Sequence, residues 1–395
     1  MSQASPRIVI LGGGFGGLYT ALRLSQFPWT SPPTITLVDQ QDRFLFAPFL
    51  YELLTNEMQT WEIAPPFVEL LGDTGVIFEQ QTVTGIDFEQ QEVQFATGSC
   101  LGFDYLVIAM GSSTPMPPVP GIKDYALPFR TLDDAYRVKQ QLTQLEQSEL
   151  EKIRVAIVGG GYSGVELATK LADRLGKTGR IRIIERSKTL LGYSPEFNRS
   201  TAEEVLSEKG VWVDLETEVT QVSADGITLQ YREQTDIIPV DLVLWTVGSS
   251  VSPMIKGLPV PHADTGQLAI TAELTIKEHD HLFALGDVAT GQDATGQRLP
   301  TTAQVAFQQA DYCAWNLWAS ITERPLLPFR YQALGEMLTL GTDDAVLNGL
   351  GVKLSGSAAV LARRLVYLYR FPTWQHQLTV GMNWLAKPLL SLFEG

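Results

Sequence analysis

IVILGGGFGGLYTA, residues 8 to 21, and VAIVGGGYSGVELA, residues 155 to 168, are two copies of one pattern. Each begins with a short apolar run typical of a buried β-strand and continues directly into a glycine-rich turn and a helical segment. The glycines have the G-x-G-x-x-G spacing of dinucleotide-binding turns. They are Gly12, Gly14 and Gly17 in the first copy, and Gly159, Gly161 and Gly164 in the second.

Each glycine of the pattern has its own physical reason. The first permits a tight turn, the second lets the backbone approach a pyrophosphate, and the third lets the helix lie close to the strand. The start of the helix then offers free N–H groups and the positive end of its dipole to the phosphates. A single match of this kind is a weak signal, because glycine-rich turns are common.

An acidic strand end follows each turn and strengthens the interpretation. The strand ITLVD ends at Asp39, and the strand IRIIE ends at Glu185. A carboxylate in this place accepts hydrogen bonds from ribose hydroxyls. Two unrelated turns without ligands would require strand, glycines, helix and acid to coincide twice. The sequence therefore predicts two dinucleotide sites, one at each turn.

The two halves of the chain also repeat one order of elements. After the turn and the acidic strand end, each has an antiparallel excursion and then a buried strand that ends on glycine, Gly111 in IAMGS and Gly248 in WTVGS. HLFALGDVAT, residues 281 to 290, predicts a return to the first unit. The expected fold is α/β, with two Rossmann-like domains of which the second is inserted in the first. The predicted domains are residues 1–120 with 255–335, residues 121–254, and a C-terminal region of residues 336–395.

Composition excludes several classes of function. The chain has 395 residues, enough for two or three domains, and its net charge of −15 argues against nucleic acid as a partner. Cys100 and Cys313 lie too far apart for a CxxC redox pair.

His279 and His281 lie in a polar turn without a matching ligand cluster, so no metal site is expected. The first strand starts within a few residues of the N-terminus, which leaves no room for a signal peptide and favours the cytoplasm.

The end of the chain has a different character. No run of eighteen apolar residues exists, so no membrane span is expected. Basic residues beside an apolar helical face suit a helix lying in an anionic membrane surface, and a core helix docked on the first domain fits equally well. One apolar face contains Ala358, Leu361, Ala362, Leu365 and Tyr369, and another contains Trp384, Leu385, Leu389 and Leu392. The charged residues after 345 that enter this interpretation are Lys353, Arg363, Arg364, Arg370, Lys387 and, as the only acid, Glu394.

These motifs resemble the two-dinucleotide-binding flavoproteins of the glutathione-reductase-like fold. More specifically, TTAQVAFQQA at 301–310, GGYSGVELA, FAPFLYELLT and ARRLVYLYRFP are similar to segments of the type II NAD(P)H:quinone dehydrogenases. Within that family the chain looks most like the branch of oxygenic phototrophs and plastids that reduces demethylphylloquinone and related quinones. The resemblance covers essentially the whole chain.

The resemblance implies a hydride transfer from NAD(P)H to one non-covalent FAD and a two-electron transfer to a membrane quinone, without proton pumping. It implies peripheral attachment through the C-terminal region, at the cytoplasmic face of a thylakoid or plasma membrane. The resemblance leaves open whether the protein forms a homodimer. The residues expected around FAD are Gly12, Gly14, Gly16, Gly17, Asp39, Val83, Ala109, Gly111, Asp287 and Ala303. Those expected around the nicotinamide nucleotide are Gly159, Gly161, Gly164, Glu185, Arg186 and Gly248.

Three further residues receive catalytic roles from the resemblance. Glu166 is expected to handle a proton or to position the nicotinamide, and Gln304 and Gln308, one helical turn apart, to contact the quinone carbonyls. The choice of nucleotide stays open, because Glu185 favours NADH whereas Arg186 could bind the 2′-phosphate of NADPH. Two alternatives also stay open: a flavin reductase of a small iron–sulfur protein, and a non-enzymatic flavin redox sensor.

Overall fold

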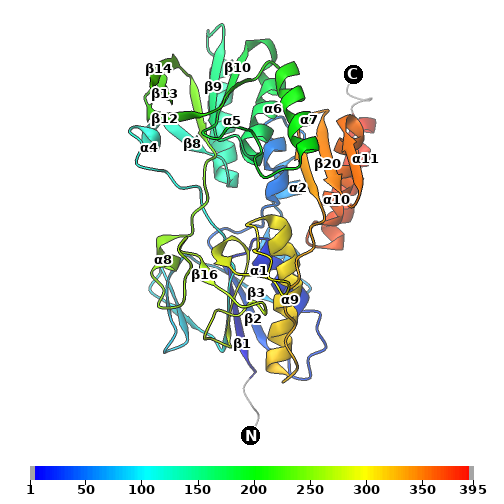
Figure 1. Cartoon of the computed structure of the whole chain (residues 1–395). Helices are drawn as coiled ribbons and strands as arrows, with labels where there is room; N and C mark the ends of the chain where they lie inside the picture. The colour runs from blue at the N-terminus through cyan, green and yellow to red at the C-terminus, as the bar shows by residue number, and fades with distance from the viewer. Residues whose placement is uncertain (1–4, 391–395) are drawn as a thin grey trace.

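The computed structural model describes the backbone of residues 5 to 390 and the side chains of residues 5 to 386. Two lobes lie one above the other, and the C-terminal strands and helices lie along one side (Figure 1). We call the lobe that contains the N-terminus the first lobe, and the other the second lobe.

The first lobe is built on a five-stranded parallel sheet. Its central strand is buried from Ile8 to Leu11, as expected for an apolar strand with both faces covered. The helices α1 (Phe15–Leu24) and α9 (Ala303–Ile321) contact each other beside this sheet. In spatial order the strands are β17 (Leu282–Ala284), β7 (Tyr105–Ile108), β1 (Arg7–Leu11), β2 (Thr34–Asp39) and β3 (Ile77–Gln80).

The second lobe repeats this plan. Its five-stranded sheet is also parallel, and a strand, the glycine turn, a helix and a second strand follow one another as in the first lobe. The helices are α5 (Leu132–Glu146), α6 (Tyr162–Leu175) and α7 (Glu196–Glu208). The strands in spatial order are β11 (Trp212–Asp214), β10 (Gly179–Ile184), β9 (Ile153–Val158), β15 (Leu242–Trp245) and β8 (Ala126–Pro128). The prediction of two Rossmann-like units is confirmed.

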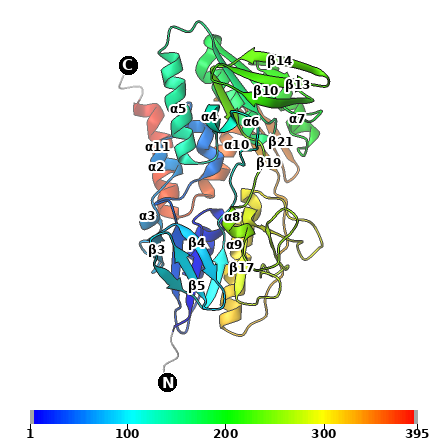
Figure 2. The same ribbon diagram turned by 90° about the vertical axis from the view of Figure 1, so that its left-hand side faces the viewer.

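Each lobe also carries a three-stranded antiparallel sheet, which is the predicted excursion (Figure 2). The first contains β4 (Val83–Asp87), β5 (Glu92–Phe95) and β6 (Cys100–Gly102). The second contains β12 (Thr217–Val222), β13 (Gly226–Tyr231) and β14 (Gln234–Pro239).

The chain passes between the lobes in two antiparallel segments. Ser113 on the outgoing segment and Ser250 on the returning one exchange two backbone hydrogen bonds, both of 2.9 Å. β17 then joins the first sheet beside β7. The second unit is therefore an insertion in the first.

The C-terminal region differs from the expected purely helical segment. It begins with an antiparallel sheet of β19 (Glu336–Thr339), β20 (Ala345–Gly349) and β21 (Val352–Ser355). Only then follow the helices α10 (Gly356–Tyr369) and α11 (Trp374–Leu390). β19 contacts α6, and β20 contacts α7 and α10, so this region docks on the second lobe. Among the described residues, no helix is long and apolar enough to cross a bilayer.

Shorter elements complete the chain. They are η1 (Ala47–Leu53), α2 (Thr60–Ile63), α3 (Phe67–Leu71), α4 (Ile122–Tyr125), η2 (Gly176–Thr178), α8 (Pro253–Lys256), β16 (Leu268–Ala269), η3 (Gly286–Val288) and β18 (Ala289–Thr290).

Candidate functional site

The first glycine turn has the geometry that its spacing predicts. Gly12 has a φ of +98°, and a Cβ atom there would lie 2.4 Å from the carbonyl oxygen of Ala109. At Gly17 a Cβ atom would lie 1.8 Å from the carbonyl oxygen of Gly12, because α1 starts directly against the end of β1. At Gly14 a Cβ atom would meet no protein atom within 4 Å. The second glycine thus faces open space at the start of α1, where a pyrophosphate fits.

The second turn reproduces these relations. Gly159 has a φ of +111°, and a Cβ atom at Gly164 would lie 1.8 Å from the carbonyl oxygen of Gly159. Gly161 again faces open space. Gly248, at the end of the neighbouring strand, lies against the segment that connects the lobes, since a Cβ atom there would lie 3.0 Å from Pro115.

The two acidic residues bind the turns that precede them. Asp39 accepts hydrogen bonds from the backbone N–H groups of Gly13 (2.6 Å) and Gln41 (2.8 Å). Glu185 accepts equivalent bonds from Gly160 and Ser187, both of 2.6 Å. Burial raises the pKa of Asp39. Burial acts in the same direction on Glu185, but its backbone hydrogen bonds outweigh it and lower the pKa, so this carboxylate is charged at neutral pH.

A cavity of about 930 Å³ opens beside the first turn. This volume lies at the upper end of the range of ligand pockets, about 300 to 1,000 Å³. Four of the residues expected around FAD line it: Gly12, Asp39, Val83 and Gly111. Of the others, Gly16 is buried, with Leu285 and Ala109 as the neighbours a Cβ atom would meet. The cavity and the open position at Gly14 fit an extended dinucleotide.

Asp287 does not itself line this cavity, but it binds two residues that do, in an ion pair and a hydrogen bond that the sequence did not reveal. Arg130 Nη2 lies 2.8 Å from its Oδ2, and the hydroxyl of Ser112 donates to the same oxygen at 2.7 Å. Ser112 also accepts a bond from Ser249, across the passage between the lobes. Arg130 and Ser112 line the cavity, so they are further residues that could contact the cofactor.

A second cavity, of about 310 Å³, lies between α9, the C-terminal sheet and α10. Its wall is largely aromatic and apolar, with Phe15, Phe46 and Phe307 among its residues. Gln304 and Gln308 line it together, as their spacing on one helical face predicts. Ala303, expected beside FAD, lines this second cavity.

The two glutamines also hold the wall opposite them. Gln304 Oε1 accepts bonds from the hydroxyl of Tyr331 (2.9 Å) and the N–H of Leu334 (3.0 Å), and its Nε2 donates to the carbonyl of Gly335 (3.0 Å). Gln308 exchanges two bonds with the backbone of Gln332. Their amides therefore position residues 331–335 in addition to facing the cavity.

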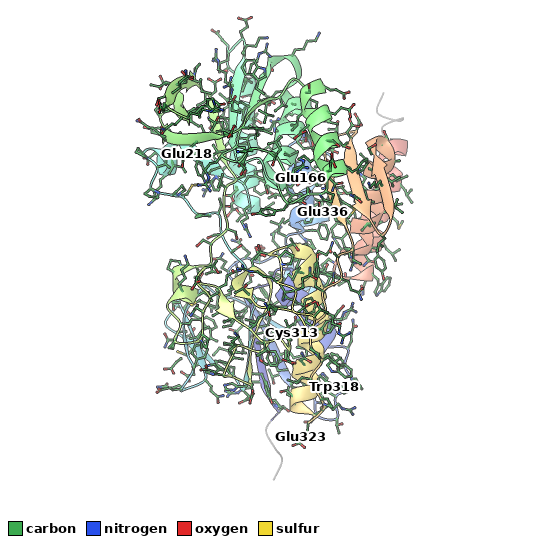
Figure 3. The ribbon with its side chains drawn as sticks, viewed as in Figure 1. Glu166, Glu218, Cys313, Trp318, Glu323 and Glu336 are labelled. Carbon is green, nitrogen blue, oxygen red and sulfur yellow. The ribbon has the colours of Figure 1, made fainter. Side chains whose placement is uncertain are left out.

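Glu166 lies on α6 where that helix meets the C-terminal sheet (Figure 3). Its side chain is buried and accepts the backbone N–H of Thr339 at 3.0 Å. Burial raises the pKa of Glu166 to about 7, although the nearby charge of Arg363 acts in the opposite direction. This carboxyl group can therefore gain and lose a proton near neutral pH.

A buried ionic cluster lies next to Glu166 and was not predicted. Arg363 on α10 binds Glu52 on η1 at 2.5 Å, and Lys170 on α6 lies 3.7 Å from the same carboxylate and also pairs with Glu57. Arg363, Glu52 and Lys170 are each less than 5 % exposed. The expectation that Arg363 contributes charge to a membrane surface is wrong, because the guanidinium faces the protein interior.

Comparison with known proteins identifies the family of the chain. The model of the pyridine nucleotide-disulphide oxidoreductase family matches residues 6–310. Demethylphylloquinone reductase NdbB of Synechocystis sp. is 68% identical over 98% of each chain. An alternative NAD(P)H-ubiquinone oxidoreductase C1 of Arabidopsis thaliana is 41% identical over 97% of this chain and 81% of the plant protein.

Solved structures show the same fold. NDH2 from Plasmodium falciparum in complex with NADH superposes with a TM-score of 0.86 and 17% identity, over 97% of this chain and 98% of that one. The two relatives and the solved structure match nearly the full length of the chain, and the family model matches residues 6–310. The chain belongs to the pyridine nucleotide-disulphide oxidoreductases and, among them, to the type II NAD(P)H:quinone oxidoreductases.

Proposed function

We propose that this NAD(P)H:quinone oxidoreductase holds one non-covalent FAD at the first turn, binds NAD(P)H at the second, and reduces a membrane naphthoquinone such as demethylphylloquinone. The observation that carries the proposal is the pairing of two equivalent glycine turns with a separate apolar cavity. The identity of 68% to a demethylphylloquinone reductase supports the naphthoquinone over other quinones.

The residues near the first turn fit FAD. Gly14 would approach the pyrophosphate, and Gly12, Gly16 and Gly17 would give the turn and the start of α1 the close packing that this approach needs. Asp39 would bind the adenosine ribose, and Asp287 with Ala109 and Gly111 would lie around the remainder of FAD. FAD when bound accepts a hydride and releases electrons to a second acceptor. In domain terms, residues 1–120 with 255–335 would hold FAD and residues 121–254 the nucleotide, with residues 336–395 giving access to quinone and membrane.

The nucleotide would bind at Gly159, Gly161 and Gly164, with Gly248 nearby. Glu185 would face its ribose, and Arg186 and Lys188, both exposed, lie directly after Glu185. Exposed cations in this place support use of NADPH as well as NADH. Glu166, buried on the helix that follows this turn, has a pKa of about 7 and is suited to proton transfer at the nicotinamide side.

Steady-state turnover of the FAD-loaded protein tests the proposal. We expect oxidation of NADPH and NADH with soluble naphthoquinone, and slower oxidation with benzoquinones. Turnover with a small iron–sulfur protein but not with quinones would favour a reductase of such a protein. Nucleotide binding without turnover on any acceptor would favour a redox sensor.

Gln304→Leu separates the two half-reactions. The substitution keeps the approximate size but removes three hydrogen bonds to residues 331–335 and an amide that faces the quinone. We expect NAD(P)H to reduce the bound FAD at the wild-type rate, and quinone to reoxidise it about ten- to a hundredfold more slowly, or about 1.4 to 2.7 kcal/mol. Stopped-flow traces measure both. Equal slowing of both half-reactions would contradict a role of Gln304 on the quinone side alone.

We further propose that α10 and α11 attach the protein to a membrane surface. Leu361, Leu365 and Tyr369 on α10 are 60%, 56% and 77% exposed, at the spacing of one helical face. α11 presents a second exposed stripe, made of Trp374, Leu378, Met382 and Leu385. Of the residues expected in this second face, Trp384 is partly buried and binds Glu62, the side chain of Leu389 is not among those described, and Leu392 lies outside the described residues.

Leu361→Glu combined with Leu365→Glu tests this attachment. Burying one leucine side chain is worth about 1.5 to 3 kcal/mol, so we expect at least about a tenfold loss of binding to anionic vesicles in a sedimentation assay. Ile237→Glu is the matched control, since Ile237 is 77% exposed on β14 of the second lobe. If the double variant still sediments with vesicles like the wild type, another surface makes the contact.

A further inference from the structure

Overall, NAD(P)H and one additional proton convert a quinone to a quinol. The hydride carries two electrons and one hydrogen nucleus, so the second quinone oxygen needs a proton from the solvent. The second cavity, where the quinone is proposed to bind, is largely apolar, so a proton has to reach it through polar side chains. The question is which residue of this chain delivers that proton.

Glu336, the first residue of β19, is the residue placed for this task. Among the described residues that line the second cavity, it is the only one with a carboxylate. It lies directly after Gly335, whose carbonyl Gln304 binds, so Glu336 and Gln304 belong to the same part of the wall. Glu166, in contrast, is buried on α6 and does not line this cavity.

A line of hydroxyl groups leads from Glu336 to the surface of the second lobe. The hydroxyl of Ser194 donates to Glu336 Oε2 at 2.6 Å. Ser194 Oγ also lies 2.7 Å from the hydroxyl of Tyr162. Because the single hydrogen of Ser194 points to Glu336, Tyr162 must be the donor in the second bond. The bonds therefore run in one direction, from Tyr162 through Ser194 to Glu336.

Solvent access along this line fits a supply of protons from the surface. The outer residue, Tyr162, is 38% exposed, whereas the middle residue, Ser194, is buried. Burial raises the pKa of Tyr162, with Glu336 adding to the effect, so the phenol keeps its proton at physiological pH and can donate. A second residue, Asn198 on α7, donates from Nδ2 to the same oxygen of Glu336 at 3.1 Å, but an amide does not pass a proton on.

We propose that Glu336 is a catalytic residue that protonates the quinone, and that Ser194 and Tyr162 resupply it from the solvent. As the quinone takes up two electrons, the Glu336 carboxylate takes the hydrogen of Ser194, Ser194 takes that of Tyr162, and Tyr162 takes one from water. The carboxyl O–H bond formed in this way then breaks as a quinone O–H bond forms, which returns Glu336 to a carboxylate. This step rests on the proposed quinone reduction.

Other titratable groups around Glu336 suit this role. Arg370 lines the same cavity and supplies the positive charge that a quinone oxygen gaining negative charge needs. The phenol of Tyr331 has a pKa raised by burial and by Glu336, so it stays neutral. Glu166, on the same helix as Tyr162, adds a negative charge that also keeps the phenol protonated.

Glu336→Gln in the FAD-loaded protein is the first test. Glutamine keeps the size and the acceptor for Ser194 but has no proton to give. At saturating soluble naphthoquinone we expect reoxidation to slow about a hundredfold, the usual contribution of a general acid. The dissociation constant for the quinone, measured by quenching of tryptophan fluorescence, should change less than about threefold. Weaker quinone binding with a normal saturated rate would overturn the proposal and leave Glu336 a positioning residue.

Ser194→Ala and Asn198→Ala form a matched pair. Each removes one hydrogen bond to the same oxygen, but only Ser194→Ala interrupts the line of hydroxyls. We expect Ser194→Ala to slow reoxidation about tenfold and to change its solvent deuterium isotope effect, with Asn198→Ala leaving that isotope effect at its wild-type value. Equal effects of both variants on the isotope effect would overturn the path. If quinone does not reoxidise the wild-type protein at all, the proposed function fails instead.

Discussion

Gly14→Val is expected to yield a folded protein without flavin. A Cβ atom at Gly14 meets no protein atom within 4 Å, so the new side chain costs the fold little and projects into the space expected for the FAD pyrophosphate. Overlap with the phosphates should lower FAD affinity at least about tenfold, or about 1.4 kcal/mol. The absorbance of flavin relative to protein measures the loss, and circular dichroism checks the fold.

Gly161→Val is the matched control because the same position in the second turn is equally open. We expect this variant to purify yellow, with its flavin unreduced by NAD(P)H at concentrations that saturate the wild type. Gly17→Ala should behave differently from both, since its Cβ atom would lie 1.8 Å from a backbone oxygen and damage the fold itself. A fully yellow Gly14→Val protein would show that FAD does not bind at the first turn.

The two Rossmann-like units could be predicted because their signals are local. A strand, the glycine turn and the start of a helix occupy fourteen adjacent residues in each copy, and each acid follows within one further strand. The glycines are also required by contacts inside the same unit, such as that of Gly17 with Gly12. The shared face of Gln304 and Gln308 was predictable for the same reason, since helical spacing alone determines it.

Long-range contacts could not be predicted in this way. The bond between Glu52 and Arg363 joins residues 311 positions apart, and that between Ser194 and Glu336 joins residues 142 positions apart. Sequence pattern placed Arg363 with the basic residues of a surface helix, because burial of a cation depends on a partner from a distant segment. The short strands of residues 336–355 gave no clear period, so the C-terminal region was expected to be helical. One feature pointed to the buried ionic cluster. Glu166 and Lys170 are two charged residues one turn apart on α6, a helix with few exposed residues.

Arg363→Met is expected to destabilise the protein by about 3 to 5 kcal/mol near neutral pH. Methionine fills much of the space but leaves the buried carboxylate of Glu52 with Lys170 as its remaining close cation. It also removes the bond from Arg363 Nη2 to the carbonyl of Pro48, which joins α10 to η1. Arg364→Met is the matched control, because Arg364 is 36% exposed and lies 3.5 Å from Glu57. We expect Arg364→Met to lower the free energy of unfolding by less than about 1 kcal/mol.

The pH dependence of the difference in unfolding free energy between the wild type and Arg363→Met tests whether Glu52 is its cause. Burial acts to raise the pKa of Glu52, but the charges of Arg363 and Lys170 outweigh it and lower the pKa in the wild type. The resulting stabilisation is present above the unfolded pKa, about 4.3, and is lost as the pH falls. In Arg363→Met the carboxyl becomes protonated at higher pH, so denaturant unfolding of the two proteins should converge on acidification. The double variant Glu52→Gln with Arg363→Met should be more stable than Arg363→Met alone, because it leaves no charge unpaired. A double variant less stable than the single one would mean that lost packing of α10, and not the unpaired carboxylate, carries the cost.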